Sequence, residues 1–349
     1  MKKKIRILIT LTILFSIVSV SYAKISATYT GFTTLGGNAK TIFDSYIEEY
    51  GVNSLNLFGS MADCFAITNT TQPVFGEGYR NLAIGVTGGI GVTVPPSTGA
   101  GSEGLGNAGL GVTAAPFITI SLDPLYSILG IGIFEDSDIT FKLLPLNIKI
   151  DEWKLNFFNM GIILRKRIIS PSTLVPVVLS FEGVSVSLGV FYSNNKINGN
   201  VDIGKTEKFE YNQPPLTGYV EGTIQSLNME FKSKSFSFDS EIKGYVNLLY
   251  ILDIFAGFGI TYNLSNNVEV TATLPANANV VVTAPIGSST TDSGTIIING
   301  EDSGRSFIPR LVSGIQLNLG PVKIPVQGAL ILGGENKTYA VTFGVTISF

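Results

Sequence analysis

Tyr339-Ala340-Val341-Thr342-Phe343-Gly344-Val345-Thr346-Ile347-Ser348-Phe349 ends the chain with a period of two. The large apolar positions of this stretch are Tyr339, Val341, Phe343, Val345, Ile347 and Phe349. Small residues, most of them polar, stand between them. Because successive side chains of a strand point to opposite faces, the stretch predicts a strand with one apolar face. A terminal strand that ends on an aromatic residue, with no polar tail, is typical of a barrel whose outer face meets lipid.

This final strand resembles the carboxyl-terminal assembly signal of bacterial outer-membrane β-barrels, which ends in Phe with apolar residues at alternate positions. The resemblance implies recognition by the barrel-assembly machinery and a location in the outer membrane. From this stretch alone, a soluble β-protein remains the alternative.

The composition agrees with a barrel. The chain of 349 residues is 45% hydrophobic and only 14% charged, and it contains 39 glycines. Long apolar runs are missing after the first 23 residues, since the stretch from Leu248 to Ile260 is too short to span and contains Asp253. Apolar residues dispersed in alternation are what a barrel requires. We therefore predict an all-β fold, an antiparallel up-and-down transmembrane β-barrel of about 12 strands, with a range of 10 to 14, over residues 81–349.

The missing residue types disfavour several functions. The chain has no His and a single cysteine, Cys64, so the usual zinc and copper sites and a Ser-His relay are not expected. We predict no enzyme activity, no catalytic residues, no cofactor and no metal. Without the four basic residues of the leader, 19 Lys and Arg face 26 Asp and Glu, and this acidic balance disfavours a nucleic-acid partner.

Residues 1–23 have the pattern of a secretory signal peptide. A basic start at Lys2, Lys3, Lys4 and Arg6 precedes an apolar region over residues 7–20, and Ser21-Tyr22-Ala23 gives a small-x-small site. We expect cleavage after Ala23. An uncleaved membrane anchor is the alternative.

Residues 24–80 are predicted to form a short amino-terminal helical segment. Ile42, Phe43, Tyr46, Ile47 and Tyr50 share one helical face, and a second helical stretch runs from Leu55 to Phe65. The segment either plugs the barrel or caps its periplasmic end, and the sequence leaves both possibilities open. Cys64 is interpreted as a buried small residue rather than a reactive thiol.

The strand over residues 233–246 alternates in polarity. Phe236, Phe238 and Ile242 lie on one face, and Ser235, Ser237, Asp239, Glu241 and Lys243 lie on the other. Such charges are costly in lipid, so this face is predicted to line a watery lumen or face solvent. The polar run at residues 192–196 is predicted to end the strand before it, and the polar cluster at 263–267 indicates a compact turn. Two long polar loops, about 95–112 and 275–304, are expected to project from the membrane, the second as a β-hairpin.

A second resemblance rests on the segments from Phe181 to Tyr192 and from Leu252 to Gly259, together with the last three strands. These segments are similar to the outer-membrane family typified by a leptospiral surface adhesin and common in spirochaetes. The family implies surface exposure and, for some members, binding to host matrix or plasma proteins. No defined binding residues carry over.

Two functions follow as hypotheses. The first is a surface-exposed, adhesin-like barrel whose partners are membrane lipid, the assembly machinery and host extracellular proteins. The alternative is an outer-membrane transporter or pore for small or hydrophobic solutes, gated by the amino-terminal segment.

Overall fold

The computed structural model describes residues 24–30, 61–70, 82–94, 109–176, 178–213, 216–283, 289–334 and 337–349. Side chains at residues 201–227 and 274–296, inside long strands, are outside this description. The predicted leader, most of the predicted helical segment and most of the loop at 95–112 also lie outside the described residues. In the described part of the chain, no helix has the length and apolar character needed to cross a membrane.

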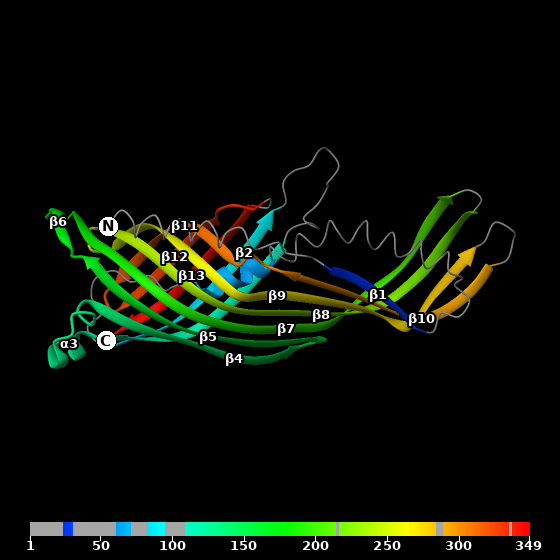
Figure 1. Cartoon of the computed structure of the whole chain (residues 1–349), viewed down its shortest axis with the longest axis horizontal. Helices are drawn as coiled ribbons and strands as arrows, with labels where there is room; N and C mark the ends of the chain where they lie inside the picture. Colours follow the sequence, from blue (N-terminus) through cyan, green and yellow to red (C-terminus); the bar gives the residue numbers. More distant parts are fainter. Residues whose placement is uncertain are drawn as a thin grey trace, which may run out of the picture.

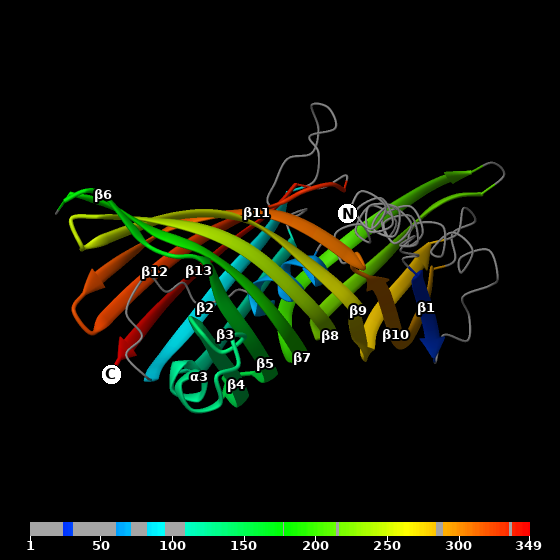
Figure 2. The ribbon, with the colours of Figure 1, turned by 60° about the vertical axis from the view of Figure 1, so that its left-hand side comes forward.

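The described strands form one antiparallel sheet that closes on itself (Figures 1 and 2). The ring follows the chain order, β2-β3-β4-β5-β7-β8-β9-β11-β12-β13, and β13 returns to β2 through twelve residue pairs from Lys337↔Val94 to Ser348↔Ala83. The predicted up-and-down barrel is therefore confirmed. Ten described strands close the ring, and this number lies within the predicted range of 10 to 14 strands.

Three other described strands lie beside this ring: β1 pairs with β10, β10 with the second half of β9, and β6 with β7. The strand bounds are β1 Lys24–Thr30, β2 Leu82–Val94, β3 Gly109–Ser121, β4 Ser137–Ile150, β5 Trp153–Ile169, β6 Ser172–Val175, β7 Leu179–Gln213, β8 Leu216–Leu248, β9 Leu252–Thr283, β10 Ser289–Ser303, β11 Phe307–Leu319, β12 Val322–Ile331 and β13 Lys337–Ser348. The helix α3, Asp123–Leu129, lies in the connection between β3 and β4.

The alternation seen in the sequence becomes the two faces of the barrel wall. Along β2, buried residues such as Thr87 and Thr93 alternate with exposed ones such as Ile84, Val86 and Ile90. Ten residues at about 3.4 Å each, tilted by about 40°, give an apolar band about 26 Å tall, close to the hydrocarbon core. The inward face carries small and polar side chains, since the lumen of a small barrel has little room.

Long strands extend the sheet beyond the ring. β7, β8 and β9 contain 35, 33 and 32 residues, although a membrane crossing needs about 9–11. We call their distal part, with β10 and β1, the sheet extension: residues 198–213, 216–230, 267–283, 289–303 and 24–30. Figure 1 shows it projecting at the end opposite to the C-terminus.

Several local predictions were wrong. Residues 192–196 do not end a strand and residues 263–267 do not form a turn, because they continue β7 and β9 with cross-strand partners such as Tyr192↔Phe236 and Asn267↔Ser303. Residues 24–30, placed in the predicted helical segment, form the strand β1. The hairpin expected at 275–304 is confirmed, because the end of β9 pairs with β10.

Candidate functional site

The predicted assembly residues of β13 all lie on the outer face of the barrel. Their exposed fractions fall between 43% and 64%, the largest being that of Phe349. Thr338, Ala340, Thr342 and Thr346, between them, are buried toward the lumen. These positions agree with a lipid-facing surface. Recognition by the assembly machinery remains a prediction.

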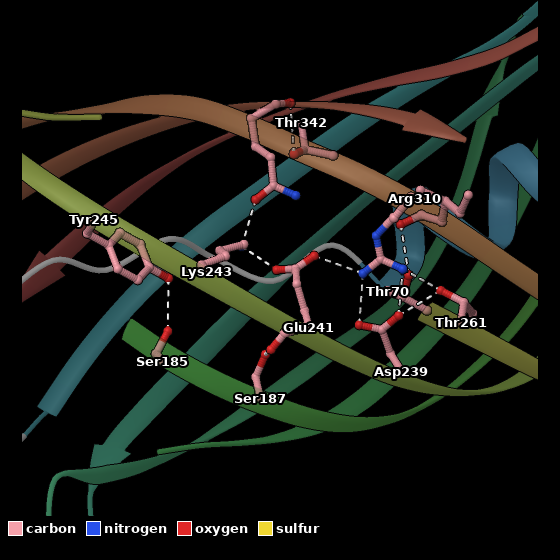
Figure 3. A network of polar contacts seen from close by, with 12 residues as sticks. Thr70, Ser185, Ser187, Asp239, Glu241, Lys243, Tyr245, Thr261, Arg310 and Thr342 are labelled. Carbon is pink, nitrogen blue, oxygen red and sulfur yellow. Dashed lines mark hydrogen bonds and ion pairs between the residues drawn. The ribbon is translucent and has the colours of Figure 1, made fainter. Parts of the chain in front are cut away.

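The lumen holds a network of buried charges that joins three strands (Figure 3). From β11, the guanidinium of Arg310 donates to Asp239 Oδ1 at 2.7 Å and to Glu241 Oε2 at 2.9 Å, both on β8. Glu241 is also ion-paired with Lys243, whose Nζ donates to Gln327 Oε1 of β12 at 2.8 Å. All four charged residues are at most 4% exposed. The predicted polar face of β8 therefore lines the lumen, and its charges are paired.

A helix over residues 61–70 lies inside the ring near the end opposite to the C-terminus (Figure 1). It contacts strands around the circumference: Cys64 Sγ is 3.2 Å from Thr93 Oγ1 of β2, and the Phe65 ring lies 5.5 Å from that of Phe231 on β8. Asp63 accepts from Arg305 Nε at 2.7 Å, just before β11. The helix thus crosses the lumen as a plug would, and Cys64 is buried, as the sequence suggested.

Glycines on the inner wall make room for this helix. A Cβ at Gly91 of β2 would lie 2.7 Å from Cys64 Cβ, and one at Gly111 of β3 would lie 2.8 Å from the same atom. Such distances are too short for carbon atoms, so only glycine allows this approach. The Gly-rich sequence of β2 is explained at these positions by the helix that it faces.

We predict that Gly91→Leu displaces the helix and opens the barrel. Purified wild-type protein in planar bilayers should show little conductance, because the helix and the charged network fill the lumen, whereas the variant should conduct at least several-fold more. The matched control is Gly132→Leu, since a Cβ at Gly132 has no atom within 4 Å. Equal conductance of wild type and Gly91→Leu, with both variants folded, would contradict a plugging role.

The polarity of the two wall faces is reversed where the sheet extension begins. Within the ring, β8 presents Phe238 and Ile242 outward and Asp239 and Glu241 inward. Beyond Ser233, its outward residues are Lys232 and Glu230, and the residue between them, Phe231, faces inward onto the helix. Since a polar outward face does not suit lipid, the membrane boundary lies near Lys234.

A ladder of ion pairs crosses the outward face of the sheet where the extension begins. Glu230 of β8 lies 2.6 Å from Lys196 Nζ on β7 and 2.8 Å from Lys232 Nζ, and Lys232 also lies 3.5 Å from Glu269 on β9. Hydrogen bonds from Lys196 and Lys232 lower the pKa of Glu230 to about 2. These exposed pairs contribute little individually, but they favour one register of long strands outside the bilayer.

The described residues contain no group of three or more His, Cys, Asp or Glu side chains that could hold a metal ion. Sequence reasoning missed Arg310 and Arg305 as partners of acidic residues. An alternation of polar and apolar residues marks a face, but it does not show which distant residue meets that face.

The sequence model of one family matches residues 21–349, nearly the whole chain. The chain belongs to the Lsa36-like family. The resemblance to the leptospiral surface adhesin family is thereby confirmed, and with the barrel it makes this Lsa36-like protein an outer-membrane protein. Comparison with curated proteins finds no match.

Solved outer-membrane barrels are similar to this Lsa36-like chain at low identity. The translocator domain of the autotransporter NalP from Neisseria meningitidis is 10% identical, with a TM-score of 0.27, over 88% of this chain and 98% of its own. Ail, the attachment invasion locus protein of Yersinia pestis, is 7% identical, with a TM-score of 0.25, over 77% and 99%. The toluene transporter TbuX of Ralstonia pickettii is 7% identical, with a TM-score of 0.24, over 83% and 93%.

Proposed function

We propose that this protein is a surface adhesin-like barrel that binds host or other extracellular proteins through its sheet extension and that has no enzyme activity. The observation that carries the proposal is the length of β7, β8 and β9, which is about three times what a membrane crossing needs. A protein that only closed a pore would gain nothing from this continuation. Membership of the Lsa36-like family supports the same role.

The orientation follows from the two ends of the ring. The C-terminus and the short turns 249–251 and 320–321 lie at one end, and the extension lies at the other. In bacterial barrels the short turns face the periplasm and the longer excursions face outward. We therefore place the extension outside the cell, with export directed by residues 1–23 and cleavage after Ala23.

The extension also has the chemistry of a contact surface. The outward face at its base carries the Lys196–Glu230–Lys232–Glu269 ladder, while apolar residues such as Trp153, Ile148 and Ile150 are exposed on the neighbouring β4–β5 hairpin. A mixture of aromatic, apolar and charged residues outside the bilayer is typical of protein–protein interfaces. Such a surface is suited to a folded protein partner.

The experiment compares full-length protein with a variant in which residues 203–226, the distal β7–β8 hairpin, are replaced by a two-residue Asn-Gly turn. Both are reconstituted in lipid nanodiscs and tested against immobilised extracellular-matrix and plasma proteins. We expect the variant to migrate as a folded, heat-modifiable barrel and to lose at least ten-fold in binding to any matrix or plasma protein that the full-length protein binds. Unchanged binding by the folded variant, or no binding by full-length protein to any member of the panel, would overturn the proposal.

The packed lumen disfavours the alternative of an open pore. Transport would require both the 61–70 helix and the Arg310 network to move. An increased conductance of the Gly91→Leu variant would indicate a barrel that can be gated, whereas an unchanged conductance would indicate a lumen that is permanently filled.

A further inference from the structure

An apolar rim surrounds part of the end of the barrel that carries the C-terminus. It is made by three connections that follow one another around the ring, between β3 and β4, between β5 and β7, and between β8 and β9. We define this apolar collar by its exposed large residues, Leu125, Ile128, Leu129, Ile131, Ile133, Ile168, Ile169, Leu174, Val175, Val178, Leu249, Tyr250 and Ile251. Figure 1 shows α3, β6 and the C-terminus at this same end.

The exposure of the collar is unusual for connections in water. Ile128 of α3 is 77% exposed, Tyr250 is 64% exposed, and α3 buries none of its residues. The opposite rim instead presents Lys232, Lys234 and Glu269 outward. Contiguous apolar exposure of this kind marks an interaction surface.

Hydrogen bonds hold the collar in place. Lys166 Nζ donates to the carbonyl oxygens of Gly132 and Glu135 at 2.7 and 2.8 Å, and the Asp136 amide donates to Asp123 Oδ1 at 2.8 Å. The Leu249 amide donates to the Val178 carbonyl at 3.0 Å, joining two connections. The apolar side chains are thus presented outward by a bonded framework. Lys166 of β5 therefore stabilises the connection between β3 and β4.

The lipid-facing surface of the barrel continues into the collar. On β5 the outward residues Met160 and Ile162 lead toward Ile168, and on β9 the outward residue Ile254 follows directly on the exposed turn at Ile251. Between β5 and β9, the outward residues Leu188 and Val190 of β7 and Ile242 of β8 are also apolar and exposed. Continuity with the lipid interface points to one occupant, the lipid of the same bilayer.

We propose that the apolar collar inserts into the periplasmic leaflet of the outer membrane. Its chemistry is that of an interfacial anchor, with aliphatic side chains among the acyl chains and Tyr250 at the headgroup level. Because the collar occupies one sector of the ring, the lipid contact is taller on the β3–β9 side than on the β11–β13 side. Insertion holds the barrel tilted, and the tilt orients the sheet extension relative to the cell surface.

The test uses tryptophan fluorescence in vesicles that contain brominated phosphatidylcholine. Trp153 is the sole tryptophan, so a Trp153→Phe background reports only an introduced indole. Ile128→Trp reports the collar, Val86→Trp the lipid-facing band and Lys234→Trp the polar rim. All three variants are first checked for heat-modifiable migration, which identifies folded barrels.

We expect bromolipid to quench Ile128→Trp at least half as strongly as Val86→Trp, and Lys234→Trp to be quenched weakly or not at all. Quenching of Ile128→Trp no greater than that of Lys234→Trp would overturn the proposal. A blue-shifted but unquenched indole would also overturn it, by showing that a protein surface covers the collar. None of these outcomes depends on ligand binding by the extension, so this proposal and the adhesin-like function can fail separately.

Discussion

Replacing Arg310 with methionine is expected to cost about 3–5 kcal/mol in the free energy of unfolding, because the change leaves two buried carboxylates without their shared cation. Arg310 is 1% exposed and bonds Asp239, Glu241 and Thr261. Methionine keeps much of the volume, so the loss reports charge and hydrogen bonding rather than a cavity. The measurement is urea-induced unfolding in lipid vesicles, followed by the heat-dependent shift of folded protein on gels.

The control for this prediction removes the charges from the partners as well. Asp239→Asn, Glu241→Gln and Arg310→Met together should recover a large part of the loss, because neutral amides are less costly to bury than unpaired carboxylates. If the free energy of unfolding of Arg310→Met lies within about 1 kcal/mol of the wild-type value, the charges are hydrated in the lumen and the network does not stabilise the barrel.

Phe343→Lys is expected to destabilise the barrel by about 2–4 kcal/mol, because a lysine at the bilayer midplane must leave water. Phe343 lies at the middle of β13 and is 54% exposed on the outer face. Refolding into vesicles of purified lipid measures this loss of stability in the absence of any assembly machinery. The free energy follows from urea titration.

Tyr339→Lys is the matched control, since it lies on the same face of the same strand near its end, and it should cost about 0–1 kcal/mol. Equal losses for the two variants would contradict the placement of β13 across the bilayer. A defect in cells that exceeds the defect in vesicles, for either variant, would support the predicted role of this strand as an assembly signal.

The final strand indicated a lipid-facing barrel because its side chains alternate, and each of its large apolar residues lies outside. For the same reason the polar face of β8 was predicted to line a lumen or face solvent, and within the ring it lines the lumen. Both inferences rest on residues two apart, whose relation is fixed by strand geometry.

The polar clusters at 192–196 and 263–267 were misread because turn composition is a local signal. Each of these segments is paired along a neighbouring strand, as in Asn194↔Lys234 and Ser265↔Phe236. Backbone pairing outside the bilayer tolerates polar side chains, so strands can run on through sequence that resembles a loop.

The class of fold could be predicted from the amino-acid sequence, because alternation with a period of two over many segments is typical of a barrel wall with one apolar and one polar face. The folded barrel was needed to show which residues share the lumen: Arg310 contacts Asp239 across 71 positions of sequence, and Arg305 contacts Asp63 across 242. It also decided where the polarity of the wall reverses and that residues 61–70 lie inside. These features depend on register and ring closure, which are set by the summed pairing of distant strands, whereas periodicity is set by the geometry of each strand alone.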